Sequence, residues 1–433
     1  MRSIPLSAFV SLWQKKSICG ANNILHKFNS RINDTKEQLL KNKLKIAIVV
    51  SHPIQHFCPQ YVSFAENENI ELKVFFGSAL GYKKYVDVNF KEEISWSNLN
   101  LDKFDHVFLN GDAVLQADKN LDAKSLEKEL ELFNPTLLIG YGYFQKLQRR
   151  AKRWALKNKL PLAYISDAEG RQKRQPVKER VKSWMLTRYF NSIRYFLTVG
   201  DANEAYYRRY GVPRTKMLRM HFPIDVKQYR KSFEDKEILR KNIREKYGIG
   251  ENEVVLSVVG KLSPWKNQDH IIEAIKILEQ KDFNSILFIL GSGQQKEAWE
   301  QKAKELKQST VYFPGFVSIE ELPAYYAATD IYVHPASVEP HSIAISEAIY
   351  MGCPVILSNR CGSYGESDDV KEGANGLVFP FGDIPALAAA IEKLGKDVVL
   401  RKSFSDCSHA RAVLFQEIAH EDVIEKLLER LAK

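Results

Sequence analysis

Short apolar runs alternate with amphipathic stretches along most of the chain. The first strong run, residues 44–50 (LKIAIVV), is apolar at every position but one, as in a parallel strand that helices cover on both faces. Helix-like stretches separate most of the similar runs that follow, at 71–76, 106–109, 136–139, 162–165 and 195–199. Strands that alternate with helices predict βαβ units and a doubly wound parallel sheet.

The same pattern starts again after residues 225–252, a charged segment of weak periodicity that we interpret as a linker. A helix is predicted at about 267–280, and strands at 254–259, 286–290, 311–313, 331–333, 354–357 and 377–379. The prediction is therefore an α/β protein with two Rossmann-like domains, 44–224 and 253–410. A basic extension (1–43) precedes them, and a C-terminal helix (411–433) packs back on the body. Two such domains leave a cleft at the carboxyl ends of their strands, where these folds bind ligands.

Composition narrows the class of protein. The 433 residues are 45% hydrophobic and 27% charged, which excludes a disordered or collagen-like chain. The net charge of +10 favours an anionic partner. The five cysteines are scattered without zinc-site spacing, so a disulfide framework and a thiolate metal site are not expected. We therefore expect a reducing, cytoplasmic location. No apolar segment reaches the roughly 18–20 residues that span a bilayer.

The first candidate site follows the predicted strand 254–259. Gly260 allows a close backbone approach, and Lys261 and Lys266 stand five residues apart at the entrance of the next helix. Two cations beside free helix N–H groups suit a diphosphate. The alternative interpretation is that these are two solvated lysines on an ordinary loop.

The second candidate site contains two carboxylates, Glu339 and Glu347. On one straight helix, residues eight apart would lie about 12 Å and roughly 80° apart, and so could not hold one ligand. They converge if Glu339 lies on a loop after which Ser342 caps a helix that contains Glu347. A surface Glu and a helix-face Glu with no shared role is the alternative interpretation.

These segments resemble the retaining, nucleotide-sugar-dependent glycosyltransferases of family 4, which have the GT-B fold and an E-x7-E motif. The resemblance covers most of the C-terminal half, through GKLSPWKN, LFILGSG, YFPGF, LPAYYAATDIYVHPA, EPHSIAISEAIYMGCPVILSN and NGLVFPFGD. In the N-terminal half it is looser, and rests on an opening Rossmann strand, TVGDANEAYYRRYGVP and PID.

The resemblance implies a role for each matching residue. Lys261 and Lys266, next to Gly260, would neutralise the donor diphosphate, and Glu347 would hold the ribose. Glu339 would contact the donor sugar and stabilise its oxocarbenium-like centre. The remaining donor-binding positions it implies are the backbone around His341, Ser342 and Ile343, and the nucleotide-side glycines Gly291 and Gly293.

The N-terminal half departs from the family pattern. The loop after the first strand is Ser-His-Pro-Ile-Gln-His, at 51–56, where the family commonly has a glycine-rich loop. No histidine stands at 165–171, where the family often has one; Asp167 offers a carboxylate there, to touch donor or acceptor hydroxyls or only to hold a turn. His52, His56 and Arg171 are the candidates for the acceptor side, although packed or surface histidines fit equally well.

A basic stretch dotted with aromatic residues spans residues 146–194, where 15 Lys or Arg face three acidic residues. Such a surface suits the headgroups of an anionic membrane or a lipid-diphosphate acceptor. A solvated basic face explains it equally well. Nucleic acid is not expected as a partner, because no nucleic-acid-binding motif accompanies the charge.

Together these features predict a retaining hexosyltransferase. It would move a sugar from a nucleotide-sugar to a glycan or lipid-linked acceptor in surface polysaccharide, lipopolysaccharide or glycolipid assembly. No cofactor and no essential metal are expected, and the enzyme would be cytoplasmic or peripheral at the cytoplasmic membrane face. Another GT-B enzyme, such as an epimerase, and a catalytically silent nucleotide-sugar-binding subunit are the alternatives.

Overall fold

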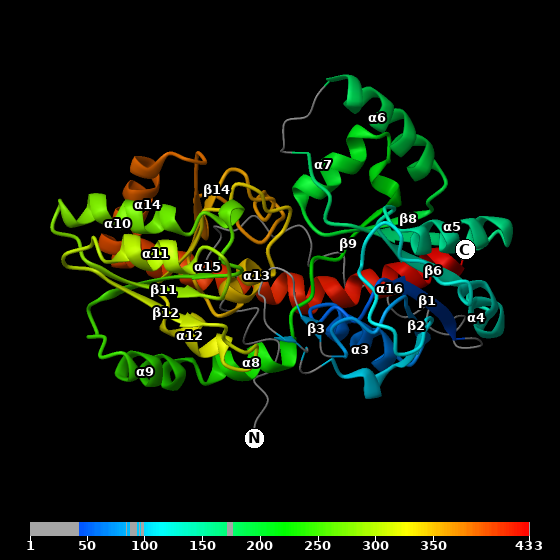
Figure 1. Ribbon diagram of the computed structural model, residues 1–433, viewed down its shortest axis with the longest axis horizontal. Helices are drawn as coiled ribbons and strands as arrows, with labels where there is room; N and C mark the ends of the chain where they lie inside the picture. The colour runs from blue at the N-terminus through cyan, green and yellow to red at the C-terminus, as the bar shows by residue number, and fades with distance from the viewer. Residues whose placement is uncertain are drawn as a thin grey trace, which may run out of the picture.

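The computed structural model describes residues 43–83, 85–86, 93–94, 96, 99–170 and 176–432. Figure 1 shows two α/β domains side by side, joined by chain crossings near the centre of the molecule. Each domain is built on one parallel sheet. The expected pair of Rossmann-like domains is thus confirmed.

The N-terminal sheet has seven strands in the order β5-β2-β1-β6-β7-β8-β9. Its strands are β1 (Leu44–Val50), β2 (Ile70–Phe76), β5 (Asp105–Phe108), β6 (Leu137–Tyr141), β7 (Leu162–Ile165), β8 (Tyr195–Thr198) and β9 (Met217–Arg219). Its helices are α3 (Cys58–Glu66), α4 (Leu126–Phe133), α5 (Lys146–Lys157), α6 (Pro176–Asn191) and α7 (Asp201–Arg209), with 3-10 turns at Leu101–Lys103 and Arg214–Lys216. A short antiparallel pair, β3 (Tyr85–Val86) and β4 (Glu93–Ile94), lies outside this sheet.

The C-terminal sheet has six strands in the order β12-β11-β10-β13-β14-β15. They are β10 (Val254–Val259), β11 (Ser285–Leu290), β12 (Thr310–Gly315), β13 (Ile331–His334), β14 (Val355–Ser358) and β15 (Gly376–Phe379). Its helices are α10 (Asp269–Glu279), α11 (Lys296–Ala303), α12 (Leu322–Ala328), α13 (Ile343–Tyr350), α14 (Ile384–Lys396) and α15 (Val398–Val413), and a 3-10 turn covers Pro264–Lys266. The chain reverses direction across the sheet between β10 and β13, and this switch point is where Rossmann-type sheets bind ligands.

The strands predicted from apolar runs all appear, within one or two residues at their ends. The interiors of β1, β10 and β11 are almost fully buried, as expected for strands covered on both faces. The periodicity analysis missed β9, which has only three residues.

The segment 225–252, interpreted as a linker, is largely helical. It forms α8 (Val226–Glu234) and α9 (Lys236–Lys246), and both pack against α12. Some of the charged side chains that mask their periodicity face the domain itself. Arg240, for example, reaches from α9 to the carboxylate of Asp330, 2.8 Å away. The structure thus attaches this segment to the C-terminal domain.

The C-terminal helix packs back on the body, as its apolar spacing predicted. Beyond α15, a π-helical turn (Leu414–Ile418) leads into α16 (Ala419–Ala432), which crosses to the N-terminal domain (Figure 1). Val423, Ile424 and Leu427 of α16 join the buried cluster beneath the N-terminal sheet. The chain therefore passes between the domains twice, before α8 and through this turn.

Gln416 ties the two crossings together. Its buried side chain donates to the carbonyl of Phe222 at 2.9 Å and accepts from the amide of Ile224 at 3.2 Å. The ring of Phe415 stacks on His221 at 4.3 Å between centroids. These contacts hold the two chain crossings between the domains together.

Candidate functional site

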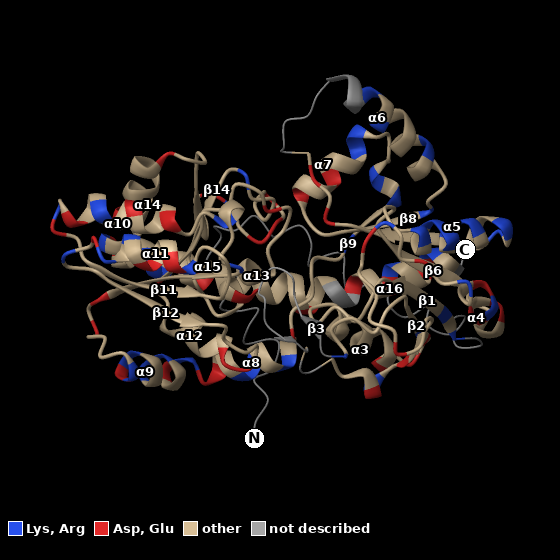
Figure 2. Ribbon diagram, in the orientation of Figure 1, with Lys and Arg blue, Asp and Glu red and all other residues tan. Residues whose placement is uncertain are grey.

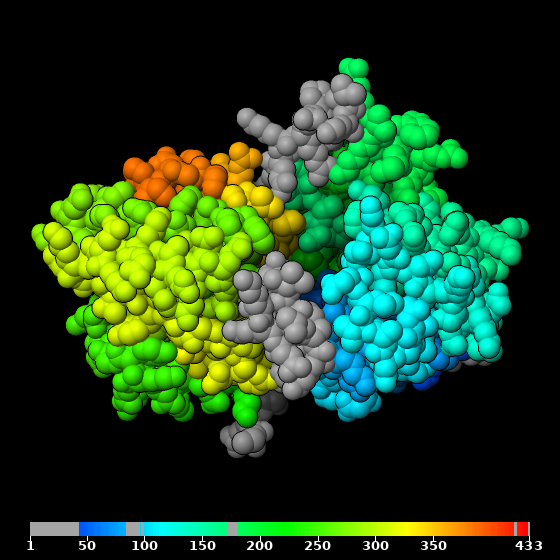
Figure 3. Space-filling model, in the orientation of Figure 1, coloured from blue at the N-terminus to red at the C-terminus, as the bar shows by residue number. Residues whose placement is uncertain are grey.

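The candidate site occupies the switch point of the C-terminal sheet. Gly260 follows β10, Gly291 and Gly293 follow β11, and Glu339 lies on the loop that joins β13 to α13. Figure 3 shows a hollow between the C-terminal half and the N-terminal half of the molecule. The structure thus brings the first and second candidate sites of the sequence to the same edge of one sheet.

Two glycines let the loops after β10 and β11 lie backbone against backbone. A Cβ on Gly291 would lie 2.0 Å from the carbonyl oxygen of Gly260, and one on Gly293 would lie 2.5 Å from that of Leu262. Gly260, Gly291 and Gly293 all have positive φ, at +149°, +138° and +154°. At Gly291 and Gly293 only glycine tolerates both the positive φ and the lack of room for a Cβ atom. These glycines therefore form the floor of the site.

Lys266, Glu339 and His334 form an ionic network beside these glycines. Lys266 Nζ pairs with Glu339 Oε2, and His334 Nε2 lies 3.1 Å from the same oxygen. Burial alone would raise the pKa of Glu339, but the hydrogen bond to His334 and the charge of Lys266 lower that pKa to about 2. Glu339 is therefore an ionised carboxylate near neutral pH. Lys261, by contrast, is exposed at the rim.

The second carboxylate of the motif has a different environment. Glu347 lies inside α13, as the converging arrangement required, and Tyr326 donates to its Oε2 at 2.9 Å. Burial raises the pKa of Glu347 to about 7, although hydrogen bonds from Tyr326 and Tyr229 oppose the shift. The charges of both Glu347 and Glu339 act on the phenol of Tyr332, which lies in the buried core of this domain. The two carboxylates thus flank one region.

The loop that precedes α13 is held from outside the helix. Ser342 stands at the N-cap position as predicted, but its side chain makes no capping hydrogen bond, and its amide donates to Ser363 Oγ at 2.8 Å. The amide of Gly362 donates to the carbonyl of Glu339 at 2.7 Å. The amides of Ile345 and Ser346 donate to the carbonyl of Ser342, at 3.2 and 3.4 Å, so the N–H groups of the first turn that remain for a ligand are those of Ile343 and Ala344.

His341 does not face solvent. It is buried, and its Nε2 lies 3.2 Å from Asp369 Oδ2. Its ring also meets the ring of Phe222 edge-on at 5.2 Å. The side chain of His341 therefore faces the boundary between the domains, and only its backbone belongs to the donor loop.

The N-terminal domain contributes Asp167 across the cleft. Asp167 follows β7, and its side chain is exposed to solvent within the cleft. The protein around it partly removes water from its carboxyl group and so raises the pKa of that group. Smaller effects come from His341, which lowers that pKa, and from Glu339, which raises it. The carboxylate thus lies within electrostatic reach of the loop that carries Glu339.

The two candidate histidines lie after β1. Burial lowers the pKa of His52 to about 4, and burial with the charge of His52 lowers that of His56 to about 4, so both rings are neutral near pH 7. A hydrogen bond of 2.9 Å joins His52 Nδ1 to Ser51 Oγ. His56 packs on Phe222, the same ring that touches His341. Arg171 lies outside the described residues.

Sequence reasoning missed several groups that define the site. His334 ends a buried strand five residues before Glu339, and a polar residue at such a strand end was the available signal. Tyr326 and Tyr229 carried no signal, because each reaches Glu347 from a different helix. Asp368 and Asp369 stand in a loop whose conformation the sequence did not predict.

In the comparison with known protein families, the match lies in the C-terminal half of the chain. Residues 240–409 match the family model of glycosyl transferases group 1. This segment contains the glycine loops, Lys261, Lys266, Glu339 and Glu347.

Curated relatives align with the same half. A GDP-mannose-dependent alpha-(1-6)-phosphatidylinositol monomannoside mannosyltransferase of Mycolicibacterium smegmatis is 32% identical over 166 residues, 36% of this chain and 42% of that protein. The lipopolysaccharide core biosynthesis glycosyltransferase LpsE of Rhizobium meliloti is 29% identical over 180 residues, 41% and 49% of the two chains. The alignment thus spans less than half the length of each of these relatives.

Solved structures align with nearly the whole chain. Anabaena HepE in complex with UDP superposes with a TM-score of 0.64 at 16% identity, over 89% of this chain and 100% of that one. WaaG, a glycosyltransferase involved in lipopolysaccharide biosynthesis, gives 0.60 at 16% identity, over 89% and 99%. At such identities the likeness concerns the fold, which is GT-B as the sequence resemblance implied.

Proposed function

We propose that this protein is a retaining glycosyltransferase that moves a sugar from a nucleotide-sugar to a glycan or lipid-linked acceptor. The observation that carries the proposal is the contact of Lys266 and His334 with the ionised Glu339 at the switch point of the C-terminal sheet. The match of residues 240–409 to glycosyl transferases group 1 supports it. So do the relatives that act on a phosphatidylinositol monomannoside and in lipopolysaccharide core biosynthesis.

The site suits the departure of a nucleoside diphosphate. Lys266 and the exposed Lys261 supply positive charge beside Gly260, and the first N–H groups of α13 supply partial positive charge. Preorganised donors of this kind stabilise the charge that develops as the bond to the sugar breaks. Because lysines and N–H groups carry this charge, we expect no metal ion on the diphosphate.

The sugar would lie between the two domains. Glu339 is ionised and can stabilise positive charge at the anomeric carbon, while Asp167 offers a second carboxylate from the N-terminal side. The neutral rings of His52 and His56 lie after β1 on the acceptor side. Closure of the domains would complete this arrangement and exclude water.

The first experiment is a thermal-shift screen of the full chain against UDP, GDP, ADP and their common sugar conjugates. A ligand at 100 times its Kd adds about 2.7 kcal/mol to the free energy of unfolding, so one nucleotide should raise the Tm by several degrees. Lys266→Ala should lose that shift, whereas Lys402→Ala, on the exposed side of α15, should keep it. No stabilisation by any nucleotide would contradict the donor site.

Glu339→Gln separates transfer from binding. The amide keeps the shape of the side chain but loses the charge, so sugar transfer should fall by at least about 100-fold while the nucleotide still stabilises the fold. Transfer to a synthetic acceptor, followed by NMR of the anomeric proton, gives both the rate and the stereochemistry. A product of inverted configuration would contradict the retaining mechanism.

We further propose that the acceptor is presented at an anionic membrane surface, contacted by α5 and α6. Figure 2 shows Lys and Arg along both helices. Large apolar side chains are exposed beside them: Phe144, Leu156, Val181, Trp184 (71% exposed) and Met185. Trp and Met beside cations suit the boundary between headgroups and acyl chains. Among the described residues, no helix combines the length and apolarity that a bilayer span needs.

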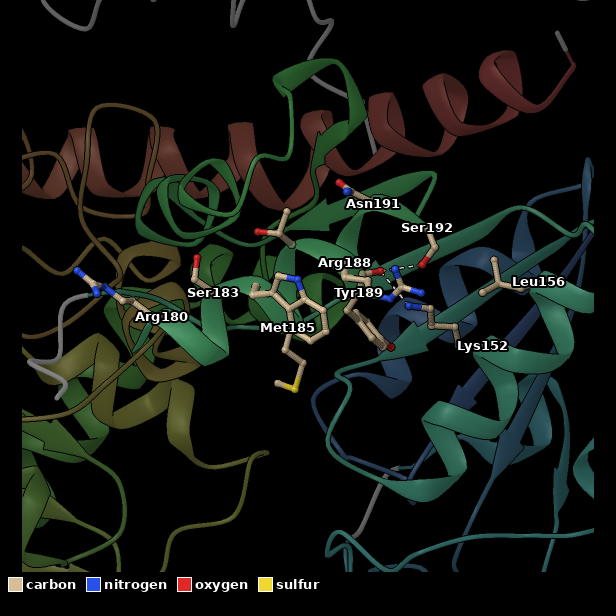
Figure 4. A pocket seen from close by; sticks show the side chains of 11 residues that line it. Lys152, Leu156, Arg180, Ser183, Met185, Arg188, Tyr189, Asn191 and Ser192 are labelled. Atoms are coloured by element: carbon tan, nitrogen blue, oxygen red, sulfur yellow. Dashed lines mark hydrogen bonds between the residues drawn. The ribbon is translucent and has the colours of Figure 1, made fainter. Parts of the chain in front are cut away.

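An open pocket of about 1170 Å³ lies on this surface (Figure 4). Lys152, Arg180 and Arg188 line it together with Leu156, Trp184 and Met185. Lys152 Nζ lies 3.4 Å from the centre of the Tyr189 ring, and burial lowers the pKa of this lysine to about 8. The pocket thus combines cations with apolar walls, as an anionic lipid headgroup requires.

Vesicle flotation tests this surface. The protein should float with phosphatidylglycerol vesicles but not with phosphatidylcholine vesicles, and less so at high salt. Trp184→Ala should weaken the binding, whereas Trp265→Ala, on the C-terminal domain and 46% exposed, should not. Equal binding to both vesicle types would contradict the proposal.

A further inference from the structure

A second cluster of chemically active side chains lies where the domains meet, away from the lysines that would bind the diphosphate. His341 reaches it from the donor loop, Asp368 and Asp369 from the loop between β14 and β15, and His221 from the segment after β9. All four are buried, with His341 and both aspartates at 1% side-chain exposure or less.

The spacing of these groups is that of metal ligands. One ligand atom from each of His341, Asp368 and Asp369 lies within 4.8 Å of the others. His341 Nε2 is 3.2 Å from Asp369 Oδ2, and His341 Nδ1 is 3.9 Å from Asp368 Oδ1. Two ligands about 2.1 Å from a tetrahedral zinc ion are themselves about 3.4 Å apart. The two His341 contacts use opposite nitrogens of the ring, so one ion would take a single ring nitrogen, and rotation of the ring or of one carboxylate would bring the three ligands around it.

Several polar atoms in this cluster make no hydrogen bond, although they are fully buried. They are Nδ1 of His341, Nδ1 of His221 and Oδ1 of Asp369, whereas Nε2 of His341 pairs with Asp369 Oδ2. His221 Nδ1 lies 4.0 Å from Asp369 Oδ1. A buried polar atom without a hydrogen bond is costly, so these atoms point to a ligand that would satisfy them together.

The charge around the cluster favours a cation. Arg219 is engaged by Asp201 and Glu204, at 2.6 and 2.9 Å. Arg411 donates to the backbone carbonyls of Asp368 and Asp369. Neither guanidinium group is hydrogen-bonded to a carboxylate oxygen of Asp368 or Asp369, so these two aspartates bring up to two negative charges into a dry site when the histidines are neutral. A divalent cation would balance them.

The carboxylates are already oriented by other groups. Ser346 Oγ donates to Asp369 Oδ2 at 2.6 Å. The amides of Asp201 and Asp369 donate to the two oxygens of Asp368, at 2.7 and 2.9 Å. Hydrogen bonds of this kind hold the ligands of metal sites in place and contribute to metal affinity.

We propose that His341, Asp368 and Asp369, with His221 beside them, bind a divalent transition-metal ion of the zinc class. Mixed imidazole and carboxylate ligands favour such an ion over Mg²⁺. The ion would tie the donor loop to the 363–370 loop, which Asp201 and Arg219 of the N-terminal domain already hold. Its role would be to fix the boundary about which the domains close, without contact with the diphosphate.

Metal analysis of the full-length protein tests this inference independently of any sugar transfer. Protein stripped with a chelator and dialysed should take up one equivalent of Zn²⁺ in a calorimetric titration, and Zn²⁺ should raise its Tm. Mg²⁺ should do neither. Ser346→Ala removes one orienting hydrogen bond and should weaken Zn²⁺ binding by about 10- to 100-fold. Asp369→Asn removes a ligand charge and should weaken it further.

His270→Gln provides a matched control, because it changes a half-buried histidine on α10 outside the cluster. Binding should be unchanged in this variant. If the wild-type protein takes up no Zn²⁺, the proposal is wrong, and the cluster is an ion pair between protonated His341 and Asp369. Binding that survives unchanged in both Ser346→Ala and Asp369→Asn would also overturn it, since the ion would then lie elsewhere. Neither result depends on whether the protein binds a nucleotide.

Discussion

Gly291→Ala should damage both stability and donor binding, because two separate demands apply at this position. Its φ of +138° costs an L-residue about 1–2 kcal/mol. The new Cβ would also lie 2.0 Å from the carbonyl oxygen of Gly260, where real Cβ atoms keep at least 3.0 Å. The loops after β10 and β11 must therefore separate by about 1 Å, and such overpacking adds about 1–3 kcal/mol.

Gly315→Ala separates the two costs. Gly315 ends the neighbouring strand β12 and has a φ of +82°, but a Cβ there would meet nothing within 4 Å. Urea unfolding should therefore show Gly291→Ala to be less stable than Gly315→Ala by at least about 1 kcal/mol. Nucleotide binding should fall about 100-fold in Gly291→Ala alone, since a displacement of about 1 Å misplaces the loop. Equal loss of stability and of binding in both variants would refute this reasoning.

Three further predictions follow from single side chains. Burial raises the pKa of Glu347 from its ordinary 4.5 to about 7, so ionising this one group costs the fold about 3 kcal/mol; in urea unfolding, the stability of the wild type should therefore fall by about that amount relative to Glu347→Gln as the pH rises from 4.5 to above 7. Gln416→Ala removes hydrogen bonds to Phe222 and Ile224 and should cost about 1–3 kcal/mol, with faster amide exchange near residues 220–224 and unchanged exchange in α10. Asp167→Asn should lower kcat of transfer by roughly 10- to 100-fold while donor affinity, measured by calorimetry, stays the same; weaker donor binding would contradict a role of this carboxylate in the transfer step alone.

The fold was predictable from sequence because it rests on local signals. Runs such as 44–50 and 254–259 are apolar at every or nearly every position, which only a strand covered on both faces requires. The two helices of the linker escaped because α9 has few apolar positions and its buried face includes the stem of Arg244. Periodicity fails where a charged side chain covers a neighbouring element through its methylene groups.

The candidate site was predictable where one short segment carried its chemistry. Gly260 and Lys266 follow β10, and Glu339 follows β13. These two strands are neighbours in the sheet, so the loops that follow them meet at one edge. Asp167 was also a candidate from the sequence, but the partners that set the charge of Glu339 and Glu347 were not identified, since His334 and Tyr326 reach the two carboxylates from different elements. Their effect on a pKa depends on distances that the chain order does not contain.

His341 shows how one loop can serve two regions of the molecule. Its backbone lies between Glu339 and the start of α13, so any shift of residue 341 changes the direction in which the first N–H groups of that helix point. Its side chain faces away, toward Asp369 and the ring of Phe222, which packs on His56 in the other domain. A change in the spacing of the domains therefore reaches the donor loop through two direct contacts. Donor binding and domain closure are therefore expected to be coupled at this residue, and replacing Phe222 by Leu, which removes the ring between His56 and His341, should weaken that coupling in a calorimetric titration of the nucleotide.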